Sequence, residues 1–193
     1  MIDPKEQYIQ TVARPIVRLL WGLHTKDLVG AEMGVFQGDL SYDILQYLPI
    51  KKLYLVDPYL EYSEQQEDKK WLTLNSNPKE AEQIKQMAAK RLSGFKNIEW
   101  IYKLSVDAAK DIPDNSLNFV YLDGNHEYDF IKNDIEIWTA KVKPGWLVAG
   151  HDGNLPSVYQ ALEEYIKLHP VHIYQGLGAG NHAPDWWFIK DDK

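Results

Sequence analysis

Two short acidic segments carry the residue types of a metal-assisted active site. Asp123 is followed three residues later by His126, and His151 stands directly before Asp152. Each segment comes directly after an apolar run that predicts a buried strand. If the two strands are neighbours, the carboxylates converge on one wall of a cleft, where they repel one another unless a cation lies between them. The pattern therefore predicts a cation site with Asp123 and Asp152 as ligands.

A divalent cation in this place would promote chemistry on a hydroxyl group. Mg²⁺ prefers oxygen ligands, retains several waters and leaves positions for the oxygens of a substrate. Such a cation lowers the pKa of a bound hydroxyl, and His126 then serves as the general base that takes the proton. The same residues also suit ordinary structure, because Asp123-Gly124-Asn125 and residues 151–154 are good turns and His126 could cap a helix. Their joint occurrence at successive strand ends favours the catalytic interpretation.

A third segment, residues 29–39, predicts a buried strand, a glycine-bounded turn and the start of a helix. Gly34 and Gly38 permit a close approach of a ligand to the main chain beside a helix N-terminus. Asp57 ends the next predicted strand, 19 residues beyond Gly38. A carboxylate in this place can accept hydrogen bonds from both hydroxyls of a ribose, whereas the alternative is that Asp57-Pro58 only turns the chain.

The remaining sequence predicts the elements that position these residues. An N-terminal helical region over 1–25 contains a helix at 3–23, and residues 60–78 are expected to be a mobile loop or a short helix. Further helices are expected at 40–48, 79–92, 127–141 and 156–168. Strands are expected at 27–33, 51–58, 97–103, 117–122, 146–150, 171–176 and 186–190. The alternation predicts an α/β fold: a Rossmann-like, doubly wound, mostly parallel seven-stranded sheet with a C-terminal antiparallel hairpin and helices on both faces.

Composition limits the class of protein. A chain of 193 residues with 45% hydrophobic content suits a single domain over 1–193. The net charge of −7 argues against a nucleic-acid partner. No apolar run reaches the roughly 18 residues that span a membrane and no secretion signal is evident, so we expect a cytoplasmic protein without a membrane partner. Seven Trp and twelve Tyr leave an aromatic-lined pocket or a homo-oligomer interface open.

Taken together, these segments resemble a class I S-adenosylmethionine (SAM)-dependent methyltransferase over roughly residues 27–190. The resemblance rests on Glu32-x-Gly34-x-x-x-Gly38, Asp57, Ser105-Val106-Asp107, Asp123-Gly124-Asn125-His126 and Pro144-Gly145-Trp146-Leu147-Val148-Ala149-Gly150-His151-Asp152. The sequence is most similar to a bacterial subgroup that carries Asp-Gly-x-His-x-Tyr followed by Gly-His-Asp. It is also similar to the metal-dependent O-methyltransferases of the catechol and macrolide-sugar types.

The resemblance implies a chemistry and a set of roles. The cofactor would be SAM, with Mg²⁺ or Mn²⁺ as the metal, and a small hydroxylated acceptor such as a sugar or phenol would be methylated on oxygen. Asp123 and Asp152 would bind the metal and His126 would be the base; where the sugar type has Glu before the last acid, this chain has His151, whose imidazole is a ligand more typical of Mn²⁺ or Zn²⁺. The cofactor-binding residues would be Glu32, Gly34 and Gly38 near the methionine part, Asp57 on the ribose, Ser105 and Val106 beside the adenine, and in addition Gln37 and Asp123.

Other functions remain open from the residues alone. An NAD-dependent oxidoreductase could share this architecture, although the turn lacks the third glycine of the dinucleotide-binding pattern. A catalytically silent SAM-fold protein could act as a binding module through its many aromatic side chains. A base-flipping nucleic-acid methyltransferase is disfavoured, because the sequence shows no recognition segment and no basic stripe.

Overall fold

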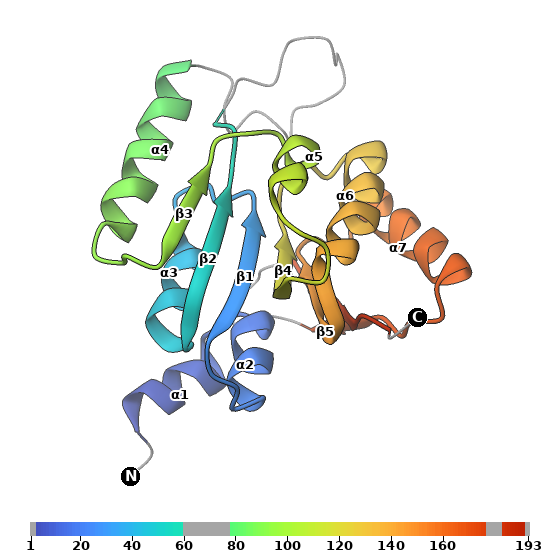
Figure 1. Cartoon of the computed structure of the whole chain (residues 1–193), viewed down its shortest axis with the longest axis horizontal. Helices are drawn as coiled ribbons and strands as arrows, with labels where there is room; N and C mark the ends of the chain where they lie inside the picture. The colour runs from blue at the N-terminus through green and yellow to red at the C-terminus, as the bar shows by residue number, and fades with distance from the viewer. Residues whose placement is uncertain (1–2, 60–77, 177–182, 192–193) are drawn as a thin grey trace.

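Seven strands form one sheet in the order β3-β2-β1-β4-β5-β7-β6 in the computed structural model, which describes residues 3–59, 78–176 and 183–191 (Figure 1). Strands β1 to β5 pair in parallel, and β7 runs antiparallel to both β5 and β6. The strands are β1 Leu28–Met33, β2 Ile50–Val56, β3 Ile98–Ile101, β4 Leu117–Leu122, β5 Val142–Gly150, β6 Tyr174–Gly176 and β7 Asp185–Ile189. The predicted fold class, including the C-terminal antiparallel pair, is confirmed.

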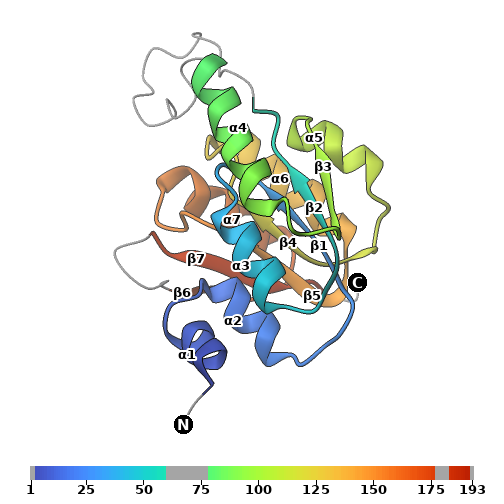
Figure 2. The ribbon, with the colours of Figure 1, turned by 90° about the vertical axis from the view of Figure 1, so that its left-hand side faces the viewer.

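Helices cover both faces of this sheet (Figure 2). They are α1 Pro4–Thr11, α2 Pro15–Gly22, α3 Asp39–Tyr47, α4 Pro78–Leu92, α5 Ser105–Ala108, α6 Tyr128–Lys141 and α7 Pro156–Leu168, with a 3-10 turn at Ala109–Asp111. The short α5 and the 3-10 turn were not predicted. The expected mobile loop at 60–78 lies outside the described residues, except that α4 begins at Pro78. Among the described helices, none is long and apolar enough to cross a membrane.

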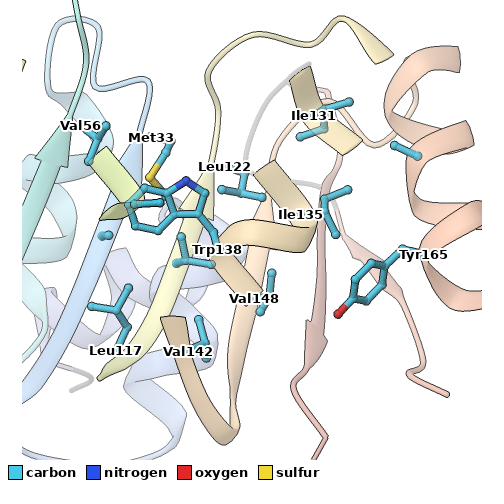
Figure 3. Close-up of a cluster of buried hydrophobic side chains, with 14 of the residues drawn as sticks. Met33, Val56, Leu117, Leu122, Ile131, Ile135, Trp138, Val142, Val148 and Tyr165 are labelled. Carbon is cyan, nitrogen blue, oxygen red and sulfur yellow. The ribbon is translucent and has the colours of Figure 1, made fainter. Parts of the chain in front are cut away.

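Two apolar clusters form the core, one on each face of the sheet. Alternate strand residues supply the two clusters, because successive side chains of a strand point to opposite faces. On the α6 side, Trp138, Ile131 and Ile135 pack against the sheet residues Leu122 and Val148 (Figure 3). On the other side, the cluster joins α2, α3 and α4 to the opposite face of the same strands. The sheet is therefore held between two layers, which fixes the positions of its strand ends.

The N-terminal segment differs from its prediction. The expected single helix at 3–23 is wrong, because the chain forms α1 and α2 with a break before Pro15. Arg14 is extended, with ψ of 153°, since a proline disfavours the helical conformation of the residue before it. Pro15 itself starts α2, where its missing N–H costs nothing. Asp3 caps α1, because its side chain accepts a hydrogen bond from the N–H of Lys5 at 2.9 Å.

The register of the central strands places the candidate residues at one level. Met33 at the end of β1 lies opposite Val56 of β2 and Leu122 of β4, and Leu122 lies opposite Gly150 of β5. The residues that follow these positions are Gly34, Asp57, Asp123 and His151. Strand order reverses between β1 and β4, which is where open α/β sheets bind ligands.

Candidate active site

A cavity of about 510 Å³ lies at the carboxyl ends of the central strands. Eight of the residues predicted to function line it: Gly34, Asp57, Ser105, Val106, Asp123, His126, His151 and Asp152. Three predicted cofactor residues do not line it, namely Glu32, Gln37 and Gly38. The cavity therefore contains both predicted cofactor-binding residues, such as Gly34 and Asp57, and the two predicted metal ligands Asp123 and Asp152.

The turn after β1 requires glycine. Gly34 has a φ of +81°, and a Cβ on it would lie 2.0 Å from the carbonyl oxygen of Asp123. Bare main chain at this position borders the cavity, as a cofactor seat requires. The turn thus fits a ligand that rests against the backbone beside the start of α3.

Asp57 faces the same turn with a fixed carboxylate. Its Oδ2 accepts a hydrogen bond from the N–H of Phe36 at 3.0 Å, and its Oδ1 accepts one from the N–H of Tyr59 at 2.9 Å. Burial raises the pKa of Asp57, and these N–H groups oppose that rise. Asp57 lines the cavity, and both of its oxygens are acceptors. This geometry fits two donors on adjacent carbons, such as ribose hydroxyls.

The three predicted cofactor residues that do not line the cavity make contacts within the protein instead. Glu32 is 2% exposed, and Ser41 donates a hydrogen bond to it. Burial raises the pKa of Glu32 to about 8, so the carboxyl is mostly protonated at neutral pH. Gly38 has a φ of +78° and caps α3, while the backbone oxygen of Gln37 accepts a hydrogen bond from Arg91.

The cavity is also lined by an acid that was not predicted from the sequence. Asp134 of α6 is 7% exposed and lines the cavity near Ser105, whose Oγ accepts a hydrogen bond from Trp138 at 2.6 Å. Burial raises the pKa of Asp134 to about 6, although a hydrogen bond with Ser105 opposes the rise. A signal was present in the sequence, since Asp134 lies three residues after Ile131 and four before Trp138, on the apolar face of the helix.

At the ends of β4 and β5, two carboxylates and two imidazoles meet. The Nε2 of His126 lies 3.5 Å from Oδ1 of Asp123 and 3.1 Å from Oδ2 of Asp152. The Nδ1 of His151 lies 3.5 Å and 3.3 Å from the same two oxygens. The structure thus brings these four residues together at one edge of the cavity.

The geometry of this cluster suits a cation. One ligand atom from each of Asp123, His126 and Asp152 lies within 4.8 Å of the others. The buried Nε2 of His126 has no hydrogen-bond partner among the described residues, despite its short distance to Asp152. A buried polar atom normally has a partner. Binding a metal ion would give the ring nitrogen of His126 such a partner. Asp152 also has a φ of +55°, an uncommon conformation for a residue other than glycine.

The charges in the cluster act strongly on one another. Burial raises the pKa of Asp123, but the imidazoles of His126 and His151 and the charge of Arg14 outweigh this effect and hold it at about 2. Burial lowers the pKa of His151, but Asp123 and Asp152 outweigh it and raise the value to about 9. Asp123 is thus ionised at every physiological pH, as a metal ligand must be.

A second residue that the sequence analysis missed is Arg14. Its guanidinium lies 3.3 Å from Oδ2 of Asp123 and 2.7 Å from Oδ1 of Asp185 on β7. No sequence pattern predicts this contact, because Arg14 lies 109 residues before Asp123 in the chain.

Solved structures share this fold. The chain superposes on the SAM-dependent O-methyltransferase of Thermotoga maritima with a TM-score of 0.62 and 12% identity, covering 100% of this chain and 73% of that one. The tRNA (m1A58) methyltransferase of Aquifex aeolicus gives a TM-score of 0.63 and 13% identity, covering 100% and 71%. The precorrin-6y C5,15-methyltransferase of Geobacter metallireducens gives 0.61 and 14%, covering 90% and 84%. At these identities the likeness shows the fold alone.

A family model, together with the fold, indicates a class I SAM-dependent methyltransferase. A sequence model of the family described as a methyltransferase domain matches residues 31–153, which is more than half of the chain. The chain belongs to this family. No curated protein sequence matches it significantly. The family assignment favours SAM as the cofactor over the nicotinamide cofactor of the oxidoreductase alternative.

Proposed function

We propose that this methyltransferase transfers the methyl group of SAM to a hydroxyl oxygen of a small acceptor, assisted by a divalent cation. The observation that carries the proposal is the half-buried trio of Asp123, His126 and Asp152, whose ligand atoms lie within 4.8 Å of one another at the edge of the cavity. The cation would polarise the acceptor hydroxyl and lower its pKa. Methyl transfer to nitrogen or to a carbanion does not require this help, so the trio favours an oxygen acceptor.

The donor set indicates which cations fit. Two carboxylate oxygens and one imidazole nitrogen suit Mn²⁺ better than Mg²⁺, which prefers oxygen alone. The surrounding charge also favours a cation, because the three acids Asp123, Asp152 and Asp185 outnumber the positive charges of Arg14 and His151 beside them. The chain therefore offers a site of the right charge and the right ligand types.

This proposal exchanges the roles that the sequence analysis gave to the two histidines. His126 becomes a ligand, because its unpartnered Nε2 belongs to the trio. The Nδ1 of His151 lies near the same two carboxylate oxygens. With His126 assigned as a ligand, His151 is the base that takes the proton of the acceptor hydroxyl. The pKa of His151 is raised by two carboxylates that a bound cation would neutralise, so the cation-bound site is the one in which His151 can accept a proton.

The rest of the cavity binds and orients the cofactor. When bound, SAM supplies a methyl group on a positively charged sulfur. Gly34 borders the cavity with bare main chain, Asp57 offers two acceptor oxygens, and Ser105 and Val106 also line the cavity. Much of the rate of a group transfer comes from holding donor and acceptor in line, and these fixed groups supply that restraint.

The proposed acceptor is a small hydroxylated molecule rather than a nucleic acid. Enzymes acting on RNA occur among proteins of this fold, including the Aquifex aeolicus tRNA methyltransferase. This chain carries a net charge of −7, whereas a protein that follows a phosphate backbone normally presents a basic surface. The sugar and phenol classes both provide hydroxyl groups that a cation can bind.

Calorimetry and a turnover assay test the proposal together. Wild-type protein is titrated with S-adenosylhomocysteine (SAH), then with Mn²⁺ and Mg²⁺, and SAH formation from SAM is followed over a panel of sugars and phenols with and without EDTA. We expect Mn²⁺ binding, and turnover that EDTA abolishes. His126→Ala should lose Mn²⁺ binding, whereas His151→Ala should retain it and lose turnover. EDTA-insensitive turnover, or equal Mn²⁺ affinity in His126→Ala, removes the metal from the mechanism.

Two alternatives have their own signatures in the same experiments. A silent binding module would take up SAH tightly and form no product over the whole panel. An oxidoreductase would bind NADH in a separate titration and would not bind SAH. Either result replaces the proposed function.

A further inference from the structure

Arg14 reaches the catalytic cluster from the break between the two N-terminal helices. Its backbone is extended because Pro15 follows it, so the side chain leaves the helical segment and extends to the sheet. The guanidinium carbon lies 5.0 Å from the ring centre of Tyr121 on β4, and the side chain is 26% exposed. The helix break therefore places the positively charged guanidinium of Arg14 at the end of β4.

The two oxygens of Asp123 face different partners. Oδ2 lies 3.3 Å from Nη1 of Arg14, whereas Oδ1 lies 3.5 Å from both His126 and His151. A carboxylate held through one oxygen presents the other in a fixed direction. That direction leads to the trio in which Asp123, His126 and Asp152 converge.

The guanidinium is itself held by a rigid pair of residues. Its Nη2 donates to Oδ1 of Asp185 at 2.7 Å, and the hydroxyl of Tyr121 donates to the same oxygen at 2.8 Å. Asp185 and Tyr121 are 2% and 0% exposed. The other oxygen of Asp185 has no hydrogen-bond partner among the described residues, so its charge is compensated mainly by Arg14. The planar fork of an arginine can bond two carboxylates at once, which the single ammonium of a lysine cannot do with the same geometry.

We propose that Arg14 is a positioning residue that orients Asp123 for the divalent cation, anchored in turn by Asp185 and Tyr121. The inference rests on the metal site of the proposed function and adds a residue to it. Groups that hydrogen-bond to a metal-binding carboxylate commonly change metal affinity by 10- to 100-fold when they are removed. Arg14 occupies such a place on Asp123.

Electrostatics and orientation predict opposite effects of removing this arginine. Deleting a positive charge next to the site strengthens the attraction for a cation, so a purely electrostatic effect raises the affinity for Mn²⁺. Losing the hold on Asp123 lets its carboxylate rotate away and lowers the affinity. A loss of affinity in a variant without the charge therefore identifies orientation as the role of Arg14.

The experiment measures Mn²⁺ affinity by the loss of the free-ion EPR signal and SAH affinity by calorimetry, with the thermal midpoint of each protein. The variants are Arg14→Gln and Arg14→Lys. The control is Lys52→Gln, which removes one cation from an exposed ion pair with Glu99 at the opposite end of the strands. We expect Mn²⁺ affinity to fall at least about 10-fold in Arg14→Gln and several-fold in Arg14→Lys. SAH affinity in both, and all affinities in Lys52→Gln, should stay within about twofold of wild type.

The outcomes separate this inference from the proposed function. Mn²⁺ affinity that is unchanged or higher in Arg14→Gln, with wild type binding normally, overturns the role of Arg14 and leaves the metal site intact. If Arg14→Gln does not fold, Arg14→Lys decides, because wild-type Mn²⁺ affinity in that charged variant overturns the role as well. A wild-type protein that binds SAH and no Mn²⁺ overturns the metal site itself, and with it this inference.

Discussion

Gly34 and Asp123 are in backbone contact across the ends of β1 and β4. A Cβ on Gly34 would lie 2.0 Å from the carbonyl oxygen of Asp123, and the N–H of Asp123 donates to the carbonyl of Met33 at 2.9 Å. The turn proposed to bind the cofactor and the acid proposed to hold the cation are therefore in contact. A change on one side of this contact displaces the other.

Gly34→Ala is predicted to damage both the cofactor seat and the fold. Alanine at a φ of +81° is strained, and its methyl group would meet backbone atoms that have no room to move. We expect a loss of stability of at least about 3 kcal/mol, and no measurable SAH binding in any protein that remains folded. Urea unfolding and SAH calorimetry check this. Gly94→Ala is the control, since a Cβ there has no heavy atom within 4 Å; a Gly34→Ala protein that behaves like the control contradicts the geometry.

Asp57→Asn is predicted to remove discrimination for the ribose. The variant replaces one acceptor oxygen by an amide that donates, so one of the two hydrogen bonds expected from the ribose is lost. A hydrogen bond to a charged group contributes about 1.5–3 kcal/mol, which predicts SAH binding about 10- to 100-fold weaker. The sharper measurement compares SAH with its 2′-deoxy analogue. Wild type should prefer SAH, and a variant that keeps the full preference would show that Asp57 only shapes the turn of Phe36 and Tyr59.

The sheet and its strand ends were predictable because their signals are local. Apolar runs that end in Asp57, Asp123 and His151 predict buried parallel strands, and such strands end at one edge of a sheet. A doubly wound parallel sheet places the ends of its strands side by side, so the fold class also predicted that these residues share one cavity. The predicted boundaries differ from those of the structure by up to four residues, most at β5, which begins at Val142 and not at the predicted residue 146.

The parts that escaped prediction depend on contacts between distant segments. Pro15 has a favourable place at the start of a helix, so the apolar periodicity on both sides concealed the break. Arg14 gains its role only when β4 and β7 lie beside it. The sequence could not decide which histidine is the ligand and which the base, because each stands close to an acid on the same edge of the sheet. In the structure they differ in the ring nitrogen that faces Asp152, which is Nε2 in His126 and Nδ1 in His151.

Glu32→Gln is predicted to change the pH dependence of stability. Burial raises the pKa of Glu32 to about 8, from about 4.5 in the unfolded chain, so the folded state favours the protonated form. Its stabilising contribution is complete below pH 4.5 and is lost as the pH rises through 8. A glutamine keeps an oxygen for the hydroxyl of Ser41 and cannot ionise. The free energy of unfolding in urea, measured at pH 6 and pH 9, should fall less in Glu32→Gln than in wild type.

The exposed Glu80 on α4 provides the control for that variant. Glu80→Gln should leave the wild-type decline between pH 6 and pH 9 unchanged. A Glu32→Gln protein whose decline equals that of wild type shows that other groups cause the pH dependence.

Asp134→Asn is predicted to stabilise the protein while weakening its cofactor binding. Burial raises the pKa of Asp134 to about 6 from 3.8 in the unfolded chain, so stability falls as the pH rises from about 4 to 6 and stays low above that. At pH 7.5 the ionised carboxylate costs the folded state on the order of 2–3 kcal/mol, which the variant recovers. At pH 4 the variant and wild type should be equally stable. Urea unfolding at the two pH values measures the difference.

Binding of the cofactor would explain why an acid that destabilises the folded state when it ionises stands at position 134. It lines the cavity beside Ser105, and an ionised carboxylate is a strong acceptor for the amino group of a purine. We therefore expect SAH binding to weaken about 10-fold in Asp134→Asn at pH 7.5, because a hydrogen bond to a neutral amide is weaker. Glu136→Gln, an exposed change on the same helix, should alter neither stability nor SAH binding. Greater stability at pH 7.5 with undiminished SAH affinity would leave Asp134 without a role in the cavity that it lines.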